Sequence, residues 1–125
     1  MGEAMVEFTR VEDQKGEALY IRGLGGDTSN CAIAAGRQGA DVAYLSSVGN
    51  DQFGNVAMDI WSKEGIDVSH ISINPGYPTG SYFIEPAPEG RNVTYYRKKN
   101  LERIVDLSRL SLMLKETIFY QKKQN

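Results

Sequence analysis

The first residues that could do chemistry form a glycine-bent polar loop that leads into a stretch of small residues. Because Gly25 and Gly26 are adjacent, the backbone there can take positive φ and approach a ligand closely. Asp27, Thr28 or Ser29 could cap a helix that starts at this point and leave its first N–H groups available. The loop is therefore a candidate site for a polar ligand, and a purely structural turn explains the pattern about equally well.

Two familiar nucleotide-binding motifs do not fit this loop. A dinucleotide fingerprint counted from Gly23 and Gly25 would need a third glycine where the chain has Thr28. A phosphate-binding P-loop would need Lys-Ser or Lys-Thr after the glycines, and neither pair follows. The glycines by themselves thus predict neither kind of nucleotide site.

A second group of polar side chains belongs to an expected hairpin with strands at residues 79–85 and 92–98. Period-two alternation puts Tyr95 and Arg97 on one face, which could also carry Tyr82 from the neighbouring strand. Phenol hydroxyls and a guanidinium there could converge on an anion. A solvated strand with aromatic cross-strand pairs is the alternative, and the pattern alone slightly favours it.

The single histidine and the single cysteine form no catalytic or metal-binding pattern. His70 has only Asp67 at a spacing of interest, so a surface or capping role fits it better than a metal ligand or a base. Cys31 lies among the small residues of an expected helix, which predicts a packed thiol. One cysteine allows no internal disulfide and favours a reducing, intracellular setting.

Composition argues against several kinds of partner. The 125 residues suffice for one domain, and a net charge of −2 favours neither nucleic acid nor an anionic membrane. No apolar run approaches the roughly 20 residues of a membrane span, and the first residues do not resemble a signal peptide. We expect a cytoplasmic protein with no nucleic-acid or membrane partner.

Strand and helix patterns alternate along the chain, which predicts an α/β sandwich around these candidates. Besides the hairpin, whose first strand Pro86 is expected to break, strands or β-biased stretches are expected at residues 4–10, 18–22, 42–45 and 66–73. The helix after the double glycine would stop at Gly39. A second helix at residues 52–64 would end at Gly65, with Phe53 and Trp61 as core anchors on its apolar face.

Three segments in register resemble the ribokinase-like (phosphofructokinase B type) carbohydrate kinase family, and within it the 2-keto-3-deoxygluconate kinase branch, over about residues 2–99. They read Gly25-Gly26-Asp27-Thr28-x-Asn30, Ser47-Val48-Gly49-x-Asp51-x-x-Gly54 and Val93-Thr94-Tyr95-Tyr96-Arg97-Lys98. The resemblance implies a partial three-layer α/β sandwich with a small β-sheet lid over a sugar site. Residues 1–100 would form the sugar-binding and lid portion, and residues 101–125 a divergent segment with a helix and a frayed tail.

The family also suggests roles for single residues. Sugar hydroxyls would be held by the double-glycine loop, which maps to Gly25, Gly26, Asp27 and Asn30. The open acid of the ketodeoxygluconate branch would be engaged by lid side chains, which maps to Tyr82, Tyr95 and Arg97. A planar guanidinium suits a carboxylate, which agrees with the chemistry of the hairpin. The stretch from Gly49 to Asp51 would shape a turn and cap the second helix.

The same resemblance implies ATP-dependent phosphorylation of 2-keto-3-deoxygluconate, with Mg²⁺, by the complete enzyme. The family's later Gly-Ala-Gly-Asp segment, which supplies the anion hole and the base, is not found in this chain. We therefore assign no catalytic or metal residue, and expect the chain alone to be inactive and to bind neither ATP nor Mg²⁺ well. Alternatives are a fructokinase, ribokinase or nucleoside kinase relative, or a non-catalytic sugar-binding remnant that dimerises through its lid strands.

Overall fold

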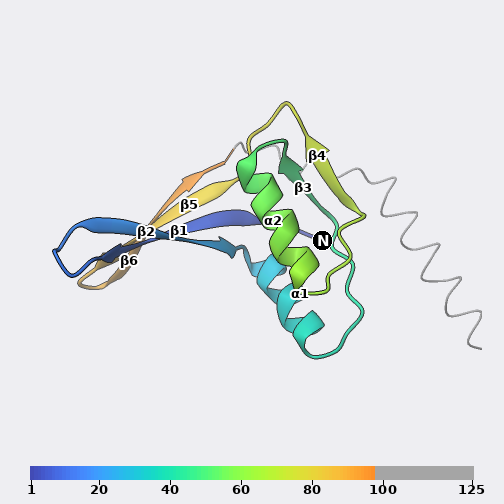
Figure 1. Cartoon of the computed structure of the whole chain (residues 1–125), viewed down its shortest axis with the longest axis horizontal. Helices are drawn as coiled ribbons and strands as arrows, with labels where there is room; N and C mark the ends of the chain where they lie inside the picture. The colour runs from blue at the N-terminus through green and yellow to red at the C-terminus, as the bar shows by residue number, and fades with distance from the viewer. Residues whose placement is uncertain (98–125) are drawn as a thin grey trace, which may run out of the picture.

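The computed structural model describes residues 1–97, which form two sheets and two helices (Figure 1). The elements are β1 (Met5–Glu12), β2 (Ala18–Gly25), α1 (Asp27–Arg37), β3 (Ser46–Gly49), α2 (Gln52–Lys63), β4 (Ile71–Asn74), β5 (Ser81–Ala87) and β6 (Gly90–Tyr96). The fold is α/β, as the sequence predicts. The expected segment at residues 101–125 lies outside the described residues.

The four-stranded sheet, with strand order β2-β1-β5-β6, extends away from the helices as a long twisted arm (Figure 1). We call it the lid sheet. Its central pair, β1 and β5, is parallel, and both outer pairs are antiparallel. The expected lid contains β2 and the hairpin, and the structure adds β1 as the strand that joins them.

A compact core lies where the helices meet the short parallel sheet of β3 and β4. Trp61 of α2 is fully buried, and its indole N–H donates to the Ser29 hydroxyl of α1 at 2.9 Å. The Tyr44 ring lies 5.0 Å from the Trp61 ring between centroids. Trp61 is thus confirmed as a core anchor, whereas Phe53 is half-buried and packs edge-to-face on Phe8 of the lid sheet.

Asp51 fixes the start of α2 and ties it to the loop before β5. Its Oδ1 accepts the Gly54 N–H at 2.8 Å, which confirms the predicted helix cap. The same carboxylate accepts both the N–H and the hydroxyl of Thr79, each at 2.7 Å. Burial raises the pKa of the Asp51 carboxyl, but its hydrogen bonds to Thr79 and Gly54 outweigh burial and hold that pKa below the ordinary value.

The predicted strand at residues 42–45 is wrong, because β3 forms later, at Ser46–Gly49. Only one bridge, between Ala43 and Asp67, forms in the earlier stretch. Asp67 then begins a turn in which its carboxylate accepts the Ser69 N–H at 2.8 Å. Because this turn interrupts the segment that pairs with residues 43–49, continuous strand pairing begins only at Ile71, opposite Ser46.

Pro86 does not break the hairpin strand, since β5 runs through it to Ala87. The β1–β5 ladder ends at the pair of Thr9 and Ile84, so Pro86 lies where β5 pairs only with β6. A missing N–H is tolerated at such an edge position.

Two expectations about α1 are also wrong. Its N-cap residue is Gly26, which has no side chain to cap the helix, and the Thr28 hydroxyl bonds to the Glu3 carbonyl. Cys31 is exposed and not packed. The buried stripe of α1 consists of Ser29 and Ala32, so Cys31 lies on another side of the helix. Gly39, with φ of 88°, follows the helix end as predicted.

Candidate functional site

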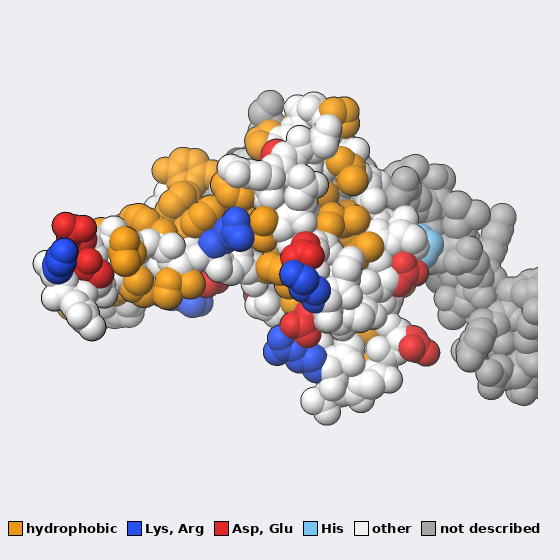
Figure 2. Space-filling view, in the orientation of Figure 1, with side chains coloured by type: hydrophobic (Ala, Val, Ile, Leu, Met, Phe, Trp, Pro, Cys, Tyr) orange, Lys and Arg blue, Asp and Glu red, His pale blue; other side chains and the backbone are white. Residues whose placement is uncertain are grey.

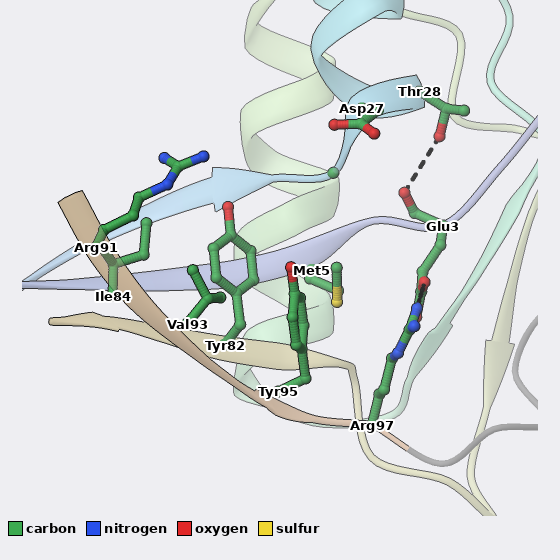
Figure 3. A pocket seen from close by; sticks show the side chains of 11 residues that line it. Glu3, Met5, Asp27, Thr28, Tyr82, Ile84, Arg91, Val93, Tyr95 and Arg97 are labelled. Carbon is green, nitrogen blue, oxygen red and sulfur yellow. Dashed lines mark hydrogen bonds and ion pairs between the residues drawn. The ribbon is translucent and has the colours of Figure 1, made fainter. Parts of the chain in front are cut away.

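A cleft of about 360 Å³ lies between the lid sheet and the start of α1 (Figure 3). Its floor comes from Met5 of β1 and from alternate residues of β5 and β6, whose side chains share one face of the sheet. Its lining residues are Glu3, Met5, Gly26, Asp27, Thr28, Tyr82, Ile84, Arg91, Val93, Tyr95 and Arg97. Carboxylates, hydroxyls and guanidinium groups thus surround a small apolar floor.

Both glycines of the loop are required by close contacts. A Cβ at Gly25 would lie 1.9 Å from the Tyr82 hydroxyl oxygen, so only glycine leaves room for this phenol. Gly26 has φ of 103°, and a Cβ there would lie 2.6 Å from the Glu3 carbonyl oxygen. The double glycine therefore lets a lid tyrosine and the first residues of the chain approach the helix start.

Tyr82 is held in place by a carboxylate on the neighbouring strand. Its hydroxyl donates to Glu7 of β1, and the other oxygen of Glu7 accepts the Thr9 hydroxyl at 2.9 Å. Burial raises the pKa of the Tyr82 phenol well above its ordinary value, and the bond to Glu7 raises it further. Tyr82 is thus a protonated, oriented phenol within the cleft.

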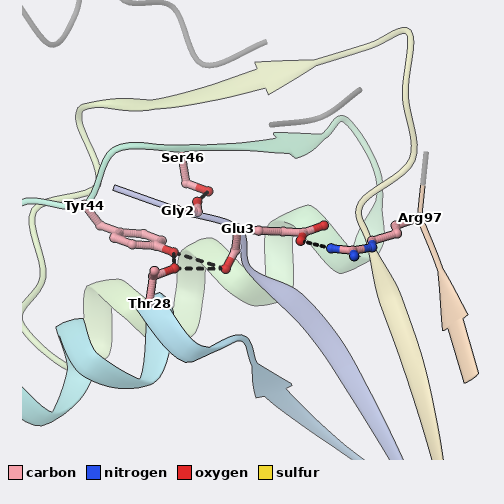
Figure 4. Close-up of polar contacts among 6 residues, drawn as sticks. All are labelled: Gly2, Glu3, Thr28, Tyr44, Ser46 and Arg97. Carbon is pink, nitrogen blue, oxygen red and sulfur yellow. Dashed lines mark hydrogen bonds and ion pairs between the residues drawn. The ribbon is translucent and has the colours of Figure 1, made fainter. Parts of the chain in front are cut away.

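Arg97 lies at one end of the cleft, beside Tyr95. Its guanidinium carbon is 5.5 Å from the centre of the Tyr95 ring, within the range of a cation–π contact. The guanidinium also forms an ion pair with Glu3 (Figure 4). The rings of Tyr82 and Tyr95 pack with their centroids 5.6 Å apart, so these three predicted residues are neighbours on the sheet side of the cleft.

The structure brings most of the predicted site residues together. Gly26, Asp27, Tyr82, Tyr95 and Arg97 line the cleft, and Gly25 lies against the Tyr82 hydroxyl. Asn30 is exposed on α1 and does not line the cleft. Sequence reasoning missed Glu3, Met5, Thr28, Ile84, Arg91 and Val93.

One signal for the missed lid residues was present. Ile84 and Val93 alternate with Tyr82 and Tyr95 along β5 and β6, so period two would have placed them on the same face.

The described residues provide no metal centre. Within residues 1–97, no three or more His, Cys, Asp or Glu side chains lie close enough to hold a metal ion. Neither helix of this part of the chain is long and apolar enough to cross a membrane.

The fold is that of ribokinase-like sugar kinases. The structure is similar to fructokinase from Xylella fastidiosa, with a TM-score of 0.76 at 22% identity over 86% of this chain and 34% of that one. At this identity the likeness defines the fold alone.

Sequence comparison adds the family. A sequence model of the pfkB family of carbohydrate kinases matches residues 1–122, so the chain belongs to that family. The chain is 33% identical over 103 residues to 2-dehydro-3-deoxygluconokinase of Thermoproteus tenax, covering 78% of this chain and 32% of that protein. It is 40% identical over 85 residues to ribokinase of Haemophilus influenzae, covering 68% of this chain and 28% of that protein. The chain thus spans about a third of the length of the curated relatives it matches.

Proposed function

We propose that this chain is the sugar-acid-binding and lid portion of an ATP-dependent kinase for 2-keto-3-deoxygluconate. The observation that supports a sugar acid most is the position of Arg97, a guanidinium at the end of a cleft that also presents the phenols of Tyr82 and Tyr95. A planar guanidinium pairs with a carboxylate through two hydrogen bonds, and phenol hydroxyls pair with the polyol. The similarity to the Thermoproteus tenax enzyme agrees with this choice.

In this proposal the described residues bind and orient the acceptor sugar. Arg97 holds the carboxylate, the double-glycine loop and Asp27 contact the hydroxyls, and the lid sheet shields the sugar from water. Asn30, which lies outside the cleft, would act only on a larger or differently placed sugar. ATP and Mg²⁺ supply the phosphoryl group and charge neutralisation in the complete enzyme, and residues 1–97 contain no cluster of three or more His, Cys, Asp or Glu side chains that could hold the metal.

The decisive experiment compares two ligands that differ only at one end. Gluconate has a carboxylate where sorbitol has a hydroxymethyl group. We expect the 125-residue chain to bind gluconate in preference to sorbitol by titration calorimetry, and Arg97→Ala to lose about tenfold or more of the gluconate affinity.

The control is Arg22→Ala, which removes the same charge from β2 at a position that does not line the cleft. Circular dichroism should show that both variants keep the fold. Equal gluconate binding by Arg97→Ala and the unchanged chain would rule out the carboxylate role.

A kinase for a neutral sugar is the second candidate, because ribokinase and fructokinase are among the similar proteins. A neutral substrate has no need of Arg97, so binding of fructose or ribose that survives Arg97→Ala would favour this alternative. We expect no ATP turnover by this chain with either substrate class, which an ADP-release assay would measure.

A further inference from the structure

Glu3 connects the core to the lid sheet through its main-chain carbonyl and its side-chain carboxylate (Figure 4). Its carbonyl oxygen accepts the Thr28 hydroxyl at 3.2 Å and the Tyr44 hydroxyl at 3.3 Å. Just before it, the Gly2 carbonyl accepts the Ser46 hydroxyl at 2.8 Å. These main-chain bonds fix the backbone of Glu3 against the helix start, so its side chain leaves from a defined point.

From this point the Glu3 carboxylate pairs with Nη1 of Arg97 at one end of the cleft. The Glu3 side chain is 18% exposed and that of Arg97 is 40% exposed, so the pair lies at the border of cleft and solvent. An ion pair this exposed contributes little to folding stability. The ion pair matters instead for ligand binding, because it occupies the guanidinium that is proposed to bind the substrate.

We propose that Glu3 is a specificity-determining residue, an internal carboxylate that occupies Arg97 in the free protein and with which an acid substrate must compete. This inference rests on the proposed role of Arg97. Because Glu3 belongs to the same chain and already contacts Arg97, its effective concentration is far above that of a free anion. A small carboxylate such as acetate therefore cannot take over the guanidinium.

A sugar acid has further contacts with which to win this competition. Its hydroxyls reach Tyr82, Tyr95 and the double-glycine loop, all of which lie at the same cleft. Only a ligand that combines a carboxylate with correctly placed hydroxyls then displaces Glu3. The internal carboxylate lowers affinity for every acid by the same factor, so an acid without the polyol no longer binds at concentrations at which a sugar acid still does.

Competition also predicts whether removing the charge of Glu3 strengthens or weakens the binding of acids. If Glu3 only positioned Arg97, removing its charge would weaken acid binding. If Glu3 competes, removing its charge also removes the repulsion between two carboxylates at one guanidinium, so acids bind more tightly. Since the ion pair is partly exposed, we expect the loss of positioning to be the smaller of the two effects.

The test is Glu3→Gln in the 125-residue chain, with Glu89→Gln as control. Glu89 is exposed in the hairpin turn at the opposite end of β6, so its variant makes the same charge change away from Arg97. We expect Glu3→Gln to bind gluconate about tenfold more tightly and sorbitol unchanged. Acetate should compete with gluconate in Glu3→Gln at concentrations that have no effect on the unchanged chain.

A second variant keeps the proposal falsifiable if the amide alters the fold. Glu3→Asp retains the charge, so it should not gain the tenfold affinity, and thermal unfolding should show that both variants remain folded. Weaker or unchanged gluconate binding by a folded Glu3→Gln, while Arg97→Ala abolishes binding, would overturn this inference alone. Gluconate binding that Arg97→Ala leaves intact would overturn the proposed function and this inference with it.

Discussion

At the scale of single residues, the position of the Tyr82 side chain in the cleft depends on the absence of a side chain at Gly25. The hydroxyl of Tyr82 donates to Glu7 of β1 and lies beside Gly25 of β2, where a Cβ would be 1.9 Å from its oxygen. Gly23, two residues earlier on the same strand, has Glu7 Cβ as the nearest atom to a built Cβ, at 3.9 Å. Two glycines of β2 thus differ in whether a side chain is tolerated.

This difference predicts opposite outcomes for two identical substitutions. Gly25→Ala should displace Tyr82 from Glu7 and lower the free energy of unfolding by about 1–3 kcal/mol. Gly23→Ala should change it by less than about 0.5 kcal/mol. Urea denaturation measures both.

Removing the clashing hydroxyl provides a further check on this contact. In the background of Tyr82→Phe, Gly25→Ala should lower the free energy of unfolding by less than it does alone, because the hydroxyl oxygen nearest the new Cβ is absent. A Gly25→Ala variant as stable as Gly23→Ala would contradict the close approach.

At the scale of elements, Asp51 connects the start of α2 to the segment just before β5, which lies far along the chain. It caps α2 through Gly54 and holds Thr79, just before β5 enters the lid sheet. Thr79 in turn accepts the Gly49 N–H at 2.9 Å. One carboxylate thereby fixes the end of β3, the start of α2 and the approach to the lid.

The lowered pKa of Asp51 predicts how its contribution depends on pH. Its folded pKa lies below the ordinary value of 3.8, so the charged form adds stability above that pH and loses it as the pH falls through the folded pKa. Asp51→Asn should cost about 1–2 kcal/mol at pH 7, and the difference from the unchanged chain should shrink below about pH 4.

The matched control for this cap is Asp59→Asn, at an exposed position on the same helix. Its i,i+4 pair with Lys63 should contribute no more than about 0.5 kcal/mol. Thermal unfolding from pH 2 to 7 compares the three proteins. A difference between Asp51→Asn and the unchanged chain that stays constant with pH would contradict a charged cap.

At the scale of the molecule, the lid sheet leaves much apolar surface in solvent. Hydrophobic side chains gather along the arm in Figure 2. Ile21 on the edge strand β2 is 61% exposed, and Tyr96 on the opposite edge strand β6 is also 61% exposed. Exposed apolar edges of this kind favour pairing with another chain.

We propose that a second copy of the chain covers the lid sheet. Light scattering after size exclusion should then give a mass near twice 13.9 kDa, which falls on dilution. Tyr96→Ser should weaken this dimer, whereas Ile73→Ser, at a 54% exposed position on β4 outside the lid, should not. A monomer at every concentration would contradict the proposal.

The sequence alone determined the local features of this protein. Helix α2, its cap at Asp51 and its buried Trp61 follow from periodicity and capping, which involve residues close together in the chain. The hairpin of β5 and β6 and the shared face of Tyr82 and Tyr95 follow from strand alternation in the same way.

Tertiary structure decided what depends on distant partners. Pro86 stays within a strand because β1 ends opposite Ile84, and β3 starts late because its partner turns at Asp67. The pairs of Tyr82 with Glu7 and of Arg97 with Glu3 join residues 75 and 94 positions apart. No local pattern encodes such contacts, since they depend on which strands become neighbours, and it is these contacts that shape the cleft.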